Sequence, residues 1–361
     1  MNRRSYIRLM AFLASTLAFR VNADIGKARS APSGQPKRDT TDWELWKAAF
    51  LTHDGRVVDH LQDDASHSEG QGYGMFLAAW FGDMQAFQRM DGWTSSFLAV
   101  RQDPLLAWRW TPNQSPQISD YNNATDGDLF HAWALLRAGL RFKSDDYLAR
   151  AREVARFIAA SCVRPDPRGN GRLLFLPGAE RFSTDEYATV NPSYYMPLAM
   201  RELGLAASEP ALLRCADDGE ALLAELAVAV GLVPDWIDVG PFGWRYAQGH
   251  PAQSGYDALR SALFLIWSGS LDHPAVERAA AFYIAEAKRG APVPTVIASS
   301  GKTVRATSDY PGYEAVSALV SCAAGADEHV MISRSLDDQP YFPATLHLFS
   351  QIASDTVGLT C

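Results

Sequence analysis

The 361-residue chain has few of the residues on which several protein classes depend. It contains only four cysteines, none of them in a C-x-x-C spacing: Cys162, Cys215, Cys322 and Cys361. Zinc ribbons and dithiol redox sites are therefore excluded. Disulfide pairing stays open, and Cys361 at the terminus is as well suited to remain free. Basic residues are also scarce, 33 against 41 acidic ones, and the net charge of −8 argues against a nucleic-acid partner.

The common nucleotide, hydrolase and metal motifs are missing as well. Gly301-Lys302-Thr303 resembles the end of a phosphate-binding loop, but Val296 stands where the first glycine is required. No G-x-S-x-G or H-E-x-x-H motif occurs. His53, His60 and His67 are spaced by seven, but the glycine and polar residues between them disfavour a shared helix face. We therefore expect neither a metal ion nor an organic cofactor.

Long apolar runs are missing except near the N-terminus. Arg3, Arg4 and Arg8 precede the apolar run 9–19, and residues 21–23 offer a small-residue cleavage site. This pattern predicts a secretory signal over residues 1–23, cleaved near Ala23, and a periplasmic or secreted protein. Eleven apolar residues are too few to cross about 30 Å of hydrocarbon, so we expect no membrane span in the mature protein. The Arg3-Arg4 pair leaves general secretion and twin-arginine export open.

Removal of the signal would leave 29 basic and 41 acidic side chains, a net charge of −12. Segment 24–41 is rich in Ser, Pro, Gly and Lys and is predicted to be a flexible tether. No later stretch reads as an internal linker. With 47% hydrophobic residues, the remainder is expected to fold, as one domain over residues 42–361.

Apolar residues recur at helical spacing along this region, whereas strand alternation is scarce. Leu129, Trp133, Leu136 and Leu140, for example, form a stripe with spacings of four, three and four. Eleven helices are predicted, near residues 43–53, 71–81, 83–99, 129–140, 145–161, 194–205, 210–230, 259–267, 273–289, 312–325 and 343–355. The fold class is therefore all-α, as a closed ring of antiparallel helical hairpins. Loops 101–125, 163–193 and 232–254 are expected to build a binding groove.

Three acidic residues stand at predicted loop-to-helix junctions: Glu69, Asp126 and Asp257. Each alone also fits a helix cap or a first-turn acid. In a ring of hairpins, however, such junctions can converge at one end. Two carboxyl groups across an aromatic groove suit glycoside hydrolysis, which needs one protonated and one ionised carboxyl group. The glycines around Glu69 are expected to let the backbone approach a ligand closely.

The tryptophans divide into two groups. Those on helical stripes are predicted to lie in the core: Trp80, Trp133 and Trp267. Those in loop-like segments beside Pro, Gly or Arg are candidate platforms for sugar rings: Trp108, Trp110, Trp236 and Trp244.

Four blocks of sequence resemble glycoside hydrolase family 8, and most closely the periplasmic endo-β-1,4-glucanases found with bacterial cellulose synthases. The blocks are SEGQGYGM at 68–75, ATDGD at 124–128, NPSY at 191–194 and YDALR at 256–260, in the family's order. The resemblance covers roughly residues 43–345. It implies an (α/α)6 barrel with a cleft at one end and an inverting mechanism without a metal or organic cofactor.

The resemblance also implies roles for individual residues. Glu69 matches the general acid and Asp257 the general base, while Asp126 matches the acid that contacts the sugar at the cleavage subsite. Further groups match substrate contacts around that subsite: Tyr194, Tyr256 and Arg260. Trp108 resembles the stacking tryptophan of the family, with Trp110 as the alternative.

These matches predict an endo-β-1,4-glucanase, or cellulase, that cuts internal bonds of a β-1,4-glucan polysaccharide or oligosaccharide. A role in bacterial cellulose synthesis, with transient association with a cellulose synthase or export complex, is a further hypothesis, and we expect a monomer. Two alternatives stay open. One is the same chemistry on xylan or chitosan, and the other is a non-catalytic glycan-binding subunit of an export complex. Retention of both an acid and a base weighs against the second.

Overall fold

The computed structural model describes residues 40–290, 292–325, 336 and 338–361, which form one compact unit. The predicted signal over 1–23 and the predicted tether up to residue 39 lie outside the described residues. Thr40 precedes the first helix and Thr41 already belongs to it. No helix within the described ranges combines the length and hydropathy needed to cross a bilayer.

Eleven α-helices occur in the described part of the chain, close to the predicted positions. They are α1 (Thr41–Phe50), α2 (Ser68–Phe81), α3 (Met84–Phe97), α4 (Thr125–Phe142), α5 (Asp145–Cys162), α6 (Pro197–Ala207), α7 (Pro210–Val230), α8 (Leu259–Trp267), α9 (Pro274–Ala287), α10 (Pro311–Ala323) and α11 (Tyr341–Val357). Proline at the first or second position begins α6, α7, α9 and α10, because its missing N–H needs no partner there.

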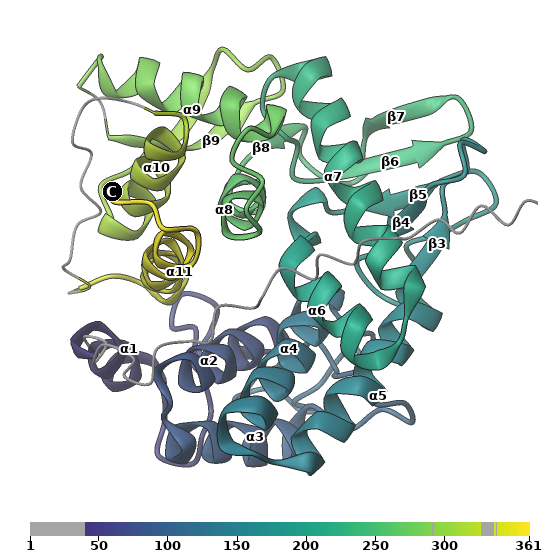
Figure 1. The fold of residues 1–361 in the computed structure, drawn as a ribbon, viewed down its shortest axis with the longest axis vertical. Coiled ribbons are helices and arrows are strands. Elements are labelled where there is room, and N and C mark those ends of the chain that lie inside the picture. Colours follow the sequence, from purple (N-terminus) through teal and green to yellow (C-terminus); the bar gives the residue numbers. More distant parts are fainter. Residues whose placement is uncertain (1–39, 291, 326–335, 337) are drawn as a thin grey trace, which may run out of the picture. The chain divides into compact units, whose positions relative to one another are not determined.

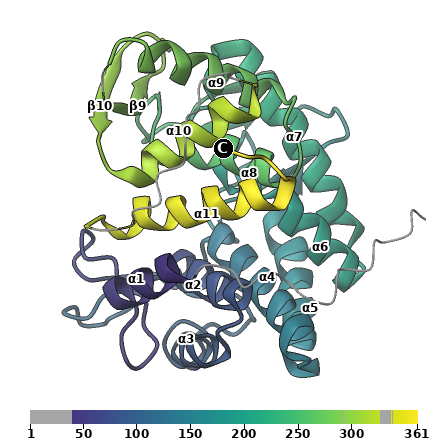
Figure 2. The ribbon, with the colours of Figure 1, turned by 60° about the vertical axis from the view of Figure 1, so that its left-hand side comes forward.

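The helices form a ring. Around it, α2 packs on α4, α4 on α6, α6 on α8, and α8 on α10 and α11. Helices α3, α5, α7 and α9 lie toward the periphery, outside α2, α4, α6 and α8 (Figure 1). Helix α11 lies between α10 and the α1–α2 pair (Figure 2). The rings of Tyr73 on α2 and Phe349 on α11 meet at 4.9 Å, which closes the circle.

Aromatic side chains fill the centre of the ring. Phe76, Phe130, Trp133, Trp267 and Phe349 are all buried and contact one another at ring-centroid distances of 4.2–6.2 Å. The core assignment of Trp133 and Trp267 is therefore confirmed.

Two details of the predicted core need correction or refinement. Trp80 is half-buried and packs against the rim of the core. The stripe on α4 ends one turn earlier than predicted, because Leu140 is 63% exposed. It lies in the last turn of α4, where the neighbouring helices no longer cover that face.

Among the residues that the structure describes, ten short strands, which the alternation pattern did not reveal, form four small antiparallel sheets in the connections. They are β1 (Ser66–His67) with β2 (Arg109–Trp110), β3 (Val163–Pro165) with β4 (Leu173–Phe175), β5 (Ala188–Val190) with β6 (Ile237–Gly240) and β7 (Gly243–Tyr246), and β8 (Gln253–Ser254) with β9 (Val293–Ala298) and β10 (Val304–Ser308). A single 3-10 turn, Pro192–Tyr194, precedes α6.

The cysteines also have defined states. Cys361 forms a disulfide with Cys322 at the end of α10, so the alternative of a free terminal thiol is wrong. Cys162 and Cys215 are buried and unpaired.

Candidate active site

The three acidic junction residues lie around one buried arginine. Glu69 is in the first turn of α2, Asp126 in the first turn of α4, and Asp257 in the turn before α8. Arg260, in the first turn of α8, donates through Nη1 to Glu69 Oε2 at 2.5 Å and to Asp126 Oδ2 at 3.1 Å. Its Nη2 donates to Asp257 Oδ1 at 2.8 Å. The helical ring therefore brings together three carboxyl groups that are far apart in the sequence.

Two neutral groups also accept hydrogen bonds from the guanidinium. Tyr73 Oη accepts a hydrogen bond from Nη1 at 3.0 Å, and Ser193 Oγ accepts one from Nη2 at 2.9 Å. The ring of Tyr194 lies with its centroid 5.6 Å from the guanidinium carbon of Arg260. Sequence reasoning singled out Tyr194 but missed Tyr73 and Ser193, although both stand inside blocks that carry the resemblance.

Exposure to solvent distinguishes the three carboxyl groups. The side chain of Asp257 is 35% exposed, that of Glu69 is 19% exposed, and that of Asp126 is only 4% exposed. Asp257 is thus the group best placed to reach a water molecule, and Asp126 is the one most removed from solvent.

The charge balance of the cluster favours retention of a proton. Burial raises the pKa of Asp126 to about 7, Arg260 opposes the shift, and the charge of Glu69 adds to it. Burial alone would lower the pKa of Arg260, but Tyr73 and the carboxyl groups raise it well above its usual value. A fixed cation therefore faces three carboxyl groups, one of which is protonated over much of the acidic range.

Local contacts hold the start of α2, and with it Glu69. His67 caps the helix, because its Nδ1 accepts the backbone N–H of Gly70 at 3.0 Å. His67 Nε2 lies 3.6 Å from Asp59 Oδ2, and the Asp59 carboxylate in turn accepts the backbone N–H of Leu61 at 3.0 Å. Strand β1, which leads into α2, pairs with β2. Neither His67 nor Asp59 was recognised from the sequence as part of this site.

Gly72 serves helix packing, so the prediction that the glycines around Glu69 open the backbone to a ligand needs correction at this position. A methyl group at Gly72 would lie 2.9 Å from the carbonyl oxygen of Gly127 on α4. One at Gly127 would lie 2.7 Å from the backbone nitrogen of Glu69. Glycine at both positions lets α2 and α4 approach closely enough to bring Glu69 and Asp126 to the same guanidinium.

The four candidate sugar platforms have different environments. Trp236 donates from Nε1 to Asp257 Oδ2 at 3.0 Å and stacks on His250 at 4.3 Å, so it supports a carboxyl group. Trp110 packs edge-on against Trp93 in a small satellite core, and Trp244 packs against the main core. Each of these three half-buried residues therefore has partners within the protein, and stacking of sugar rings on them stays a prediction.

Trp108 stays a candidate platform. It is half-buried, lies outside both of those hydrophobic clusters, and has the guanidinium carbon of Arg109 at 5.7 Å from its ring centroid. Its backbone carbonyl accepts the N–H of Ser68, next to Glu69, at 2.9 Å.

A cavity of about 570 Å³ opens beside the acid cluster. Glu69, Asp257 and the half-exposed Tyr256 line it together with side chains from the α1–α2 connection, β10, the start of α10 and the start of α11, among them Leu61, Tyr310, Tyr313 and Phe342. Apolar rings beside convergent carboxyl groups form a surface suited to a polyol with flat faces. Among the described residues, no group of three or more His, Cys, Asp or Glu side chains is arranged to hold a metal ion.

Comparison with known proteins identifies the family of this chain. The sequence profile of glycosyl hydrolases family 8 matches residues 14–356. The chain belongs to this family. Among its relatives, a probable endoglucanase of Novacetimonas hansenii is 36% identical over 243 residues, which cover 65% of this chain and 69% of that protein. An endoglucanase of Cellulomonas uda is 33% identical over 229 residues, which cover 63% of each chain. This family 8 chain thus aligns with about two thirds of the length of these curated relatives.

The fold comparison extends further along the chain. The structure of an endo-β-1,4-glucanase from Acetobacter xylinum superposes with a TM-score of 0.78 and 30% identity, over 90% of this family 8 chain and 100% of that one. The predicted (α/α)6 barrel is therefore confirmed.

Proposed function

We propose that this chain is an inverting endo-β-1,4-glucanase that hydrolyses internal bonds of a cellulose-type β-glucan. The convergence of Glu69, Asp126 and Asp257 on Arg260 beside an aromatic-lined cavity carries the proposal. Membership of family 8 and the endoglucanase names of the relatives support the choice of substrate.

In the proposed mechanism, Glu69 is the general acid and donates a proton to the leaving glycosidic oxygen. Asp257 is the general base and activates the water that attacks the anomeric carbon, in keeping with its higher exposure. Asp126 contacts the sugar at the cleavage point, together with Tyr194, Tyr256 and Arg260.

The carboxyl groups around Arg260 can stabilise the transition state electrostatically without first changing their orientation. The oxocarbenium-like transition state develops positive charge on the sugar. Carboxyl groups held by Arg260 are already oriented before substrate arrives, because Trp236 fixes the second oxygen of Asp257 and Gly127 N–H fixes the second oxygen of Asp126.

The test is hydrolysis of cellohexaose, xylohexaose and a chitosan hexamer, with the anomer of the first product read by NMR. We expect cleavage of cellohexaose and release of the α anomer, since inversion of a β bond gives α product. Release of the β anomer first would instead indicate a retaining mechanism. Retaining enzymes have their two catalytic carboxyl groups about 5–5.5 Å apart, whereas inverting enzymes have them about 6.5–9.5 Å apart. Preferential cleavage of one of the other two oligomers would reassign the substrate.

We further propose that the protein is exported, with cleavage near Ala23, and acts as a monomer in the periplasm or outside the cell. Amino-terminal sequencing of the protein purified from its host should begin at Asp24. A mature protein that keeps residues 1–23 would contradict export by a cleaved signal.

A role in bacterial cellulose synthesis, through transient contact with a synthase or export complex, is the physiological part of the proposal. Deletion of the gene should then alter cellulose yield or fibre form, and complementation with the Glu69→Gln variant should not restore it. Unchanged cellulose in the deletion strain would contradict the role.

A further inference from the structure

A second cavity, of about 540 Å³, lies on the small sheet β5–β6–β7 and has no lining residue in common with the cavity beside Glu69 and Asp257. The two sites are connected through β6. Trp236, which immediately precedes this strand, hydrogen-bonds Asp257, whereas the far end of the strand leads into the hairpin turn that lines the second cavity. At about 3.3 Å per residue, four to six extended residues place the turn at 240–242 roughly 13–20 Å from Trp236. Asp238, nearer along the strand, lines the same cavity.

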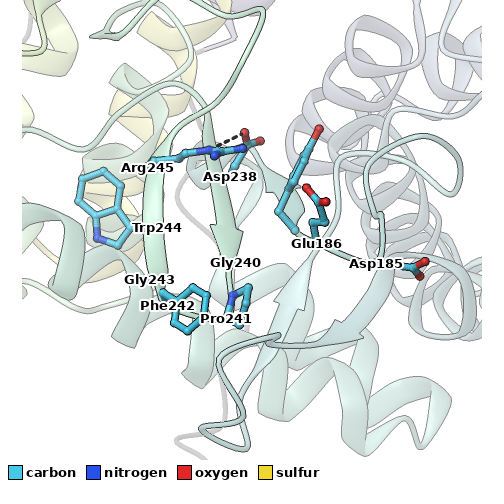
Figure 3. Close-up of a pocket in the computed structure, with 10 residues that line it drawn as sticks. Asp185, Glu186, Asp238, Gly240, Pro241, Phe242, Gly243, Trp244 and Arg245 are labelled. Carbon is cyan, nitrogen blue, oxygen red and sulfur yellow. Dashed lines mark hydrogen bonds and ion pairs between the residues drawn. The ribbon is translucent and has the colours of Figure 1, made fainter.

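Two aromatic side chains give this hairpin cavity apolar surface. Phe242, in the turn between β6 and β7, is fully exposed at 103% and is the most exposed of the large hydrophobic residues described. Tyr187, half-buried just before β5, faces the guanidinium of Arg245 at 5.3 Å from its ring centroid. Figure 3 shows Phe242 and Pro241 at the hairpin turn and the Arg245–Asp238 pair toward the other end. An exposed ring beside a cavity provides apolar contact area that folding does not use.

The polar groups of the cavity identify the class of ligand. Asp185 and Glu186 are exposed carboxyl groups on the segment that faces the hairpin. Arg245 is the single cationic side chain in the lining, and it is already paired with Asp238 at 3.4 Å. Three carboxyl groups against one paired guanidinium disfavour an anionic ligand. Acceptors beside aromatic rings suit the hydroxyl groups and flat faces of a neutral sugar chain.

We propose that the hairpin cavity, defined by Tyr187, Phe242, Asp185 and Glu186, binds a second segment of the β-glucan polymer. This segment lies outside the cavity lined by Glu69 and Asp257, which we call the catalytic cavity. The inference rests on the proposed function for its substrate class. A sugar ring stacks on the exposed aromatic surface while its hydroxyl groups donate to the two carboxylates. Because both cavities lie on one body, binding at the hairpin raises the effective concentration of polymer at the acid cluster. Short oligosaccharides that fill only the catalytic cavity gain nothing from it.

Trp244 does not belong to this binding surface, although part of the Trp244 residue also lines the cavity. Asp238 and Arg245 are register partners, as are Val239 and Trp244, so the two pairs point to opposite faces of the sheet. Arg245 and Asp238 face the cavity, whereas the ring of Trp244 packs against the core. Substitution of Trp244 would therefore damage the fold and would not report on the cavity.

The experiment compares Phe242→Ala, Tyr187→Ala and the double variant with Phe157→Ala, an exposed aromatic residue on α5, as the matched control. Binding is measured as retention of the full chain on amorphous cellulose in a Glu69→Gln background. Turnover is measured in the Glu69-intact background on amorphous cellulose and on cellotetraose. We expect the double variant to bind cellulose about tenfold more weakly and to cleave it more slowly at low concentration. Its rate on cellotetraose and all properties of Phe157→Ala should be unchanged.

Three results would overturn the proposal. One is unchanged retention of the double variant, and another is an equal loss in Phe157→Ala. The third is a parallel loss of cellotetraose turnover in Phe242→Ala, whose fully exposed side chain contributes little to folding; that loss would make the turn part of the catalytic cavity. Failure of the proposed endoglucanase function would look different from failure of the hairpin proposal. The wild type would then cleave neither amorphous cellulose nor cellotetraose, whether or not the Glu69→Gln protein is retained on cellulose.

Discussion

The catalytic cavity and the hairpin cavity are nearly equal in volume, about 570 and 540 Å³, but their charges are organised differently. At the first, the 2%-exposed side chain of Arg260 contacts three carboxyl groups from three parts of the ring. At the second, the 55%-exposed side chain of Arg245 pairs with one carboxylate on the neighbouring strand. Burial strengthens and orients the first set of interactions, whereas water weakens the second. Cavities of nearly equal size thus differ in the way that their proposed tasks require, bond cleavage at one and retention of a polymer chain at the other.

The sharpest way to separate the two cavities is to remove the proton donor. Glu69→Gln should lower kcat on β-glucan by about 10²–10⁴-fold, because an amide cannot protonate the leaving oxygen. Binding of the polymer should be largely retained. Glu186→Gln in the hairpin cavity is the matched control and should keep its kcat. The measurement is the release of reducing ends. Full turnover by Glu69→Gln would remove Glu69 from the role of general acid.

Removal of the two arginines tests the difference in burial. Arg260→Met leaves buried carboxyl groups without their partner and should lower the free energy of unfolding by about 3–5 kcal/mol. Arg245→Met removes a 55%-exposed guanidinium from Asp238, whose buried carboxylate keeps the hydrogen bonds from Thr189 Oγ1 and the Gln248 N–H, and should cost less than about 1 kcal/mol. Urea unfolding of both variants measures the difference. If Arg260→Met does not accumulate as folded protein, Arg260→Lys, which keeps the charge but loses the planar fork, should give an intermediate loss. Equal losses at the two positions would contradict the comparison.

The pH dependence of stability should also come from the buried cluster. The pKa of Asp126 is about 7 in the folded chain, against an ordinary value of 3.8. Between these values the folded state holds a proton that the unfolded chain has released. This group therefore makes the free energy of unfolding fall as the pH rises from about 4 to about 7, and its effect levels off above that. Asp126→Asn should make the slope in this window shallower by up to about 1.4 kcal/mol per pH unit.

The control for this titration is Asp185→Asn, which changes an exposed carboxyl group of the hairpin cavity. Denaturant unfolding at half-unit pH steps gives the slopes, so a constant destabilisation by either substitution does not affect the result. A slope in Asp126→Asn equal to that of the wild type would show that Asp126 holds no proton in this range.

The smallest expected effect concerns the helix start that carries Glu69. His67→Ala removes the acceptor for the Gly70 N–H and should cost about 1 kcal/mol of stability. His67→Asn supplies another acceptor at the same position and should recover most of the loss. Loss of the cap also frees Glu69 to move, so kcat should fall in His67→Ala and recover in His67→Asn. No difference between the two variants would contradict a capping role.

Much of the fold could be predicted because its signals are local. Helical spacing marks the apolar stripes that the ring buries, and each of the eleven predicted helices has its counterpart in the described residues. The short strands were missed because two to six residues carry too little alternation, and because partners such as β5 and β6 are separated by α6 and α7. Their pairing is decided by the packing of the helices between them.

The candidate site was predictable in part for the same reason. Glu69, Asp126 and Asp257 stand out by their positions at helix starts, and the family blocks name Arg260. Asp59 was missed, and the roles of Tyr73 beside Arg260 and Trp236 beside Asp257 could not be predicted locally, since each of the three residues takes part through a partner eight or more residues away. Gly72 was misread because a glycine in the first turns of a helix looks the same in the sequence whether it faces a ligand or another helix. Only the tertiary structure decides between them, because a methyl group at Gly72 would lie 2.9 Å from the carbonyl oxygen of Gly127 on α4.

By itself, the sequence determined which segments are helical, which residues carry carboxyl groups at helix starts, and to which family the blocks are similar. These properties depend on side-chain spacing along one segment or on short ordered motifs. The tertiary structure alone decided that three carboxyl groups contact one guanidinium, that Trp236 supports Asp257, and that Phe242 remains uncovered beside a second cavity. These properties depend on how closed packing of the ring positions segments up to about 190 residues apart, and on which surfaces that packing leaves open to solvent.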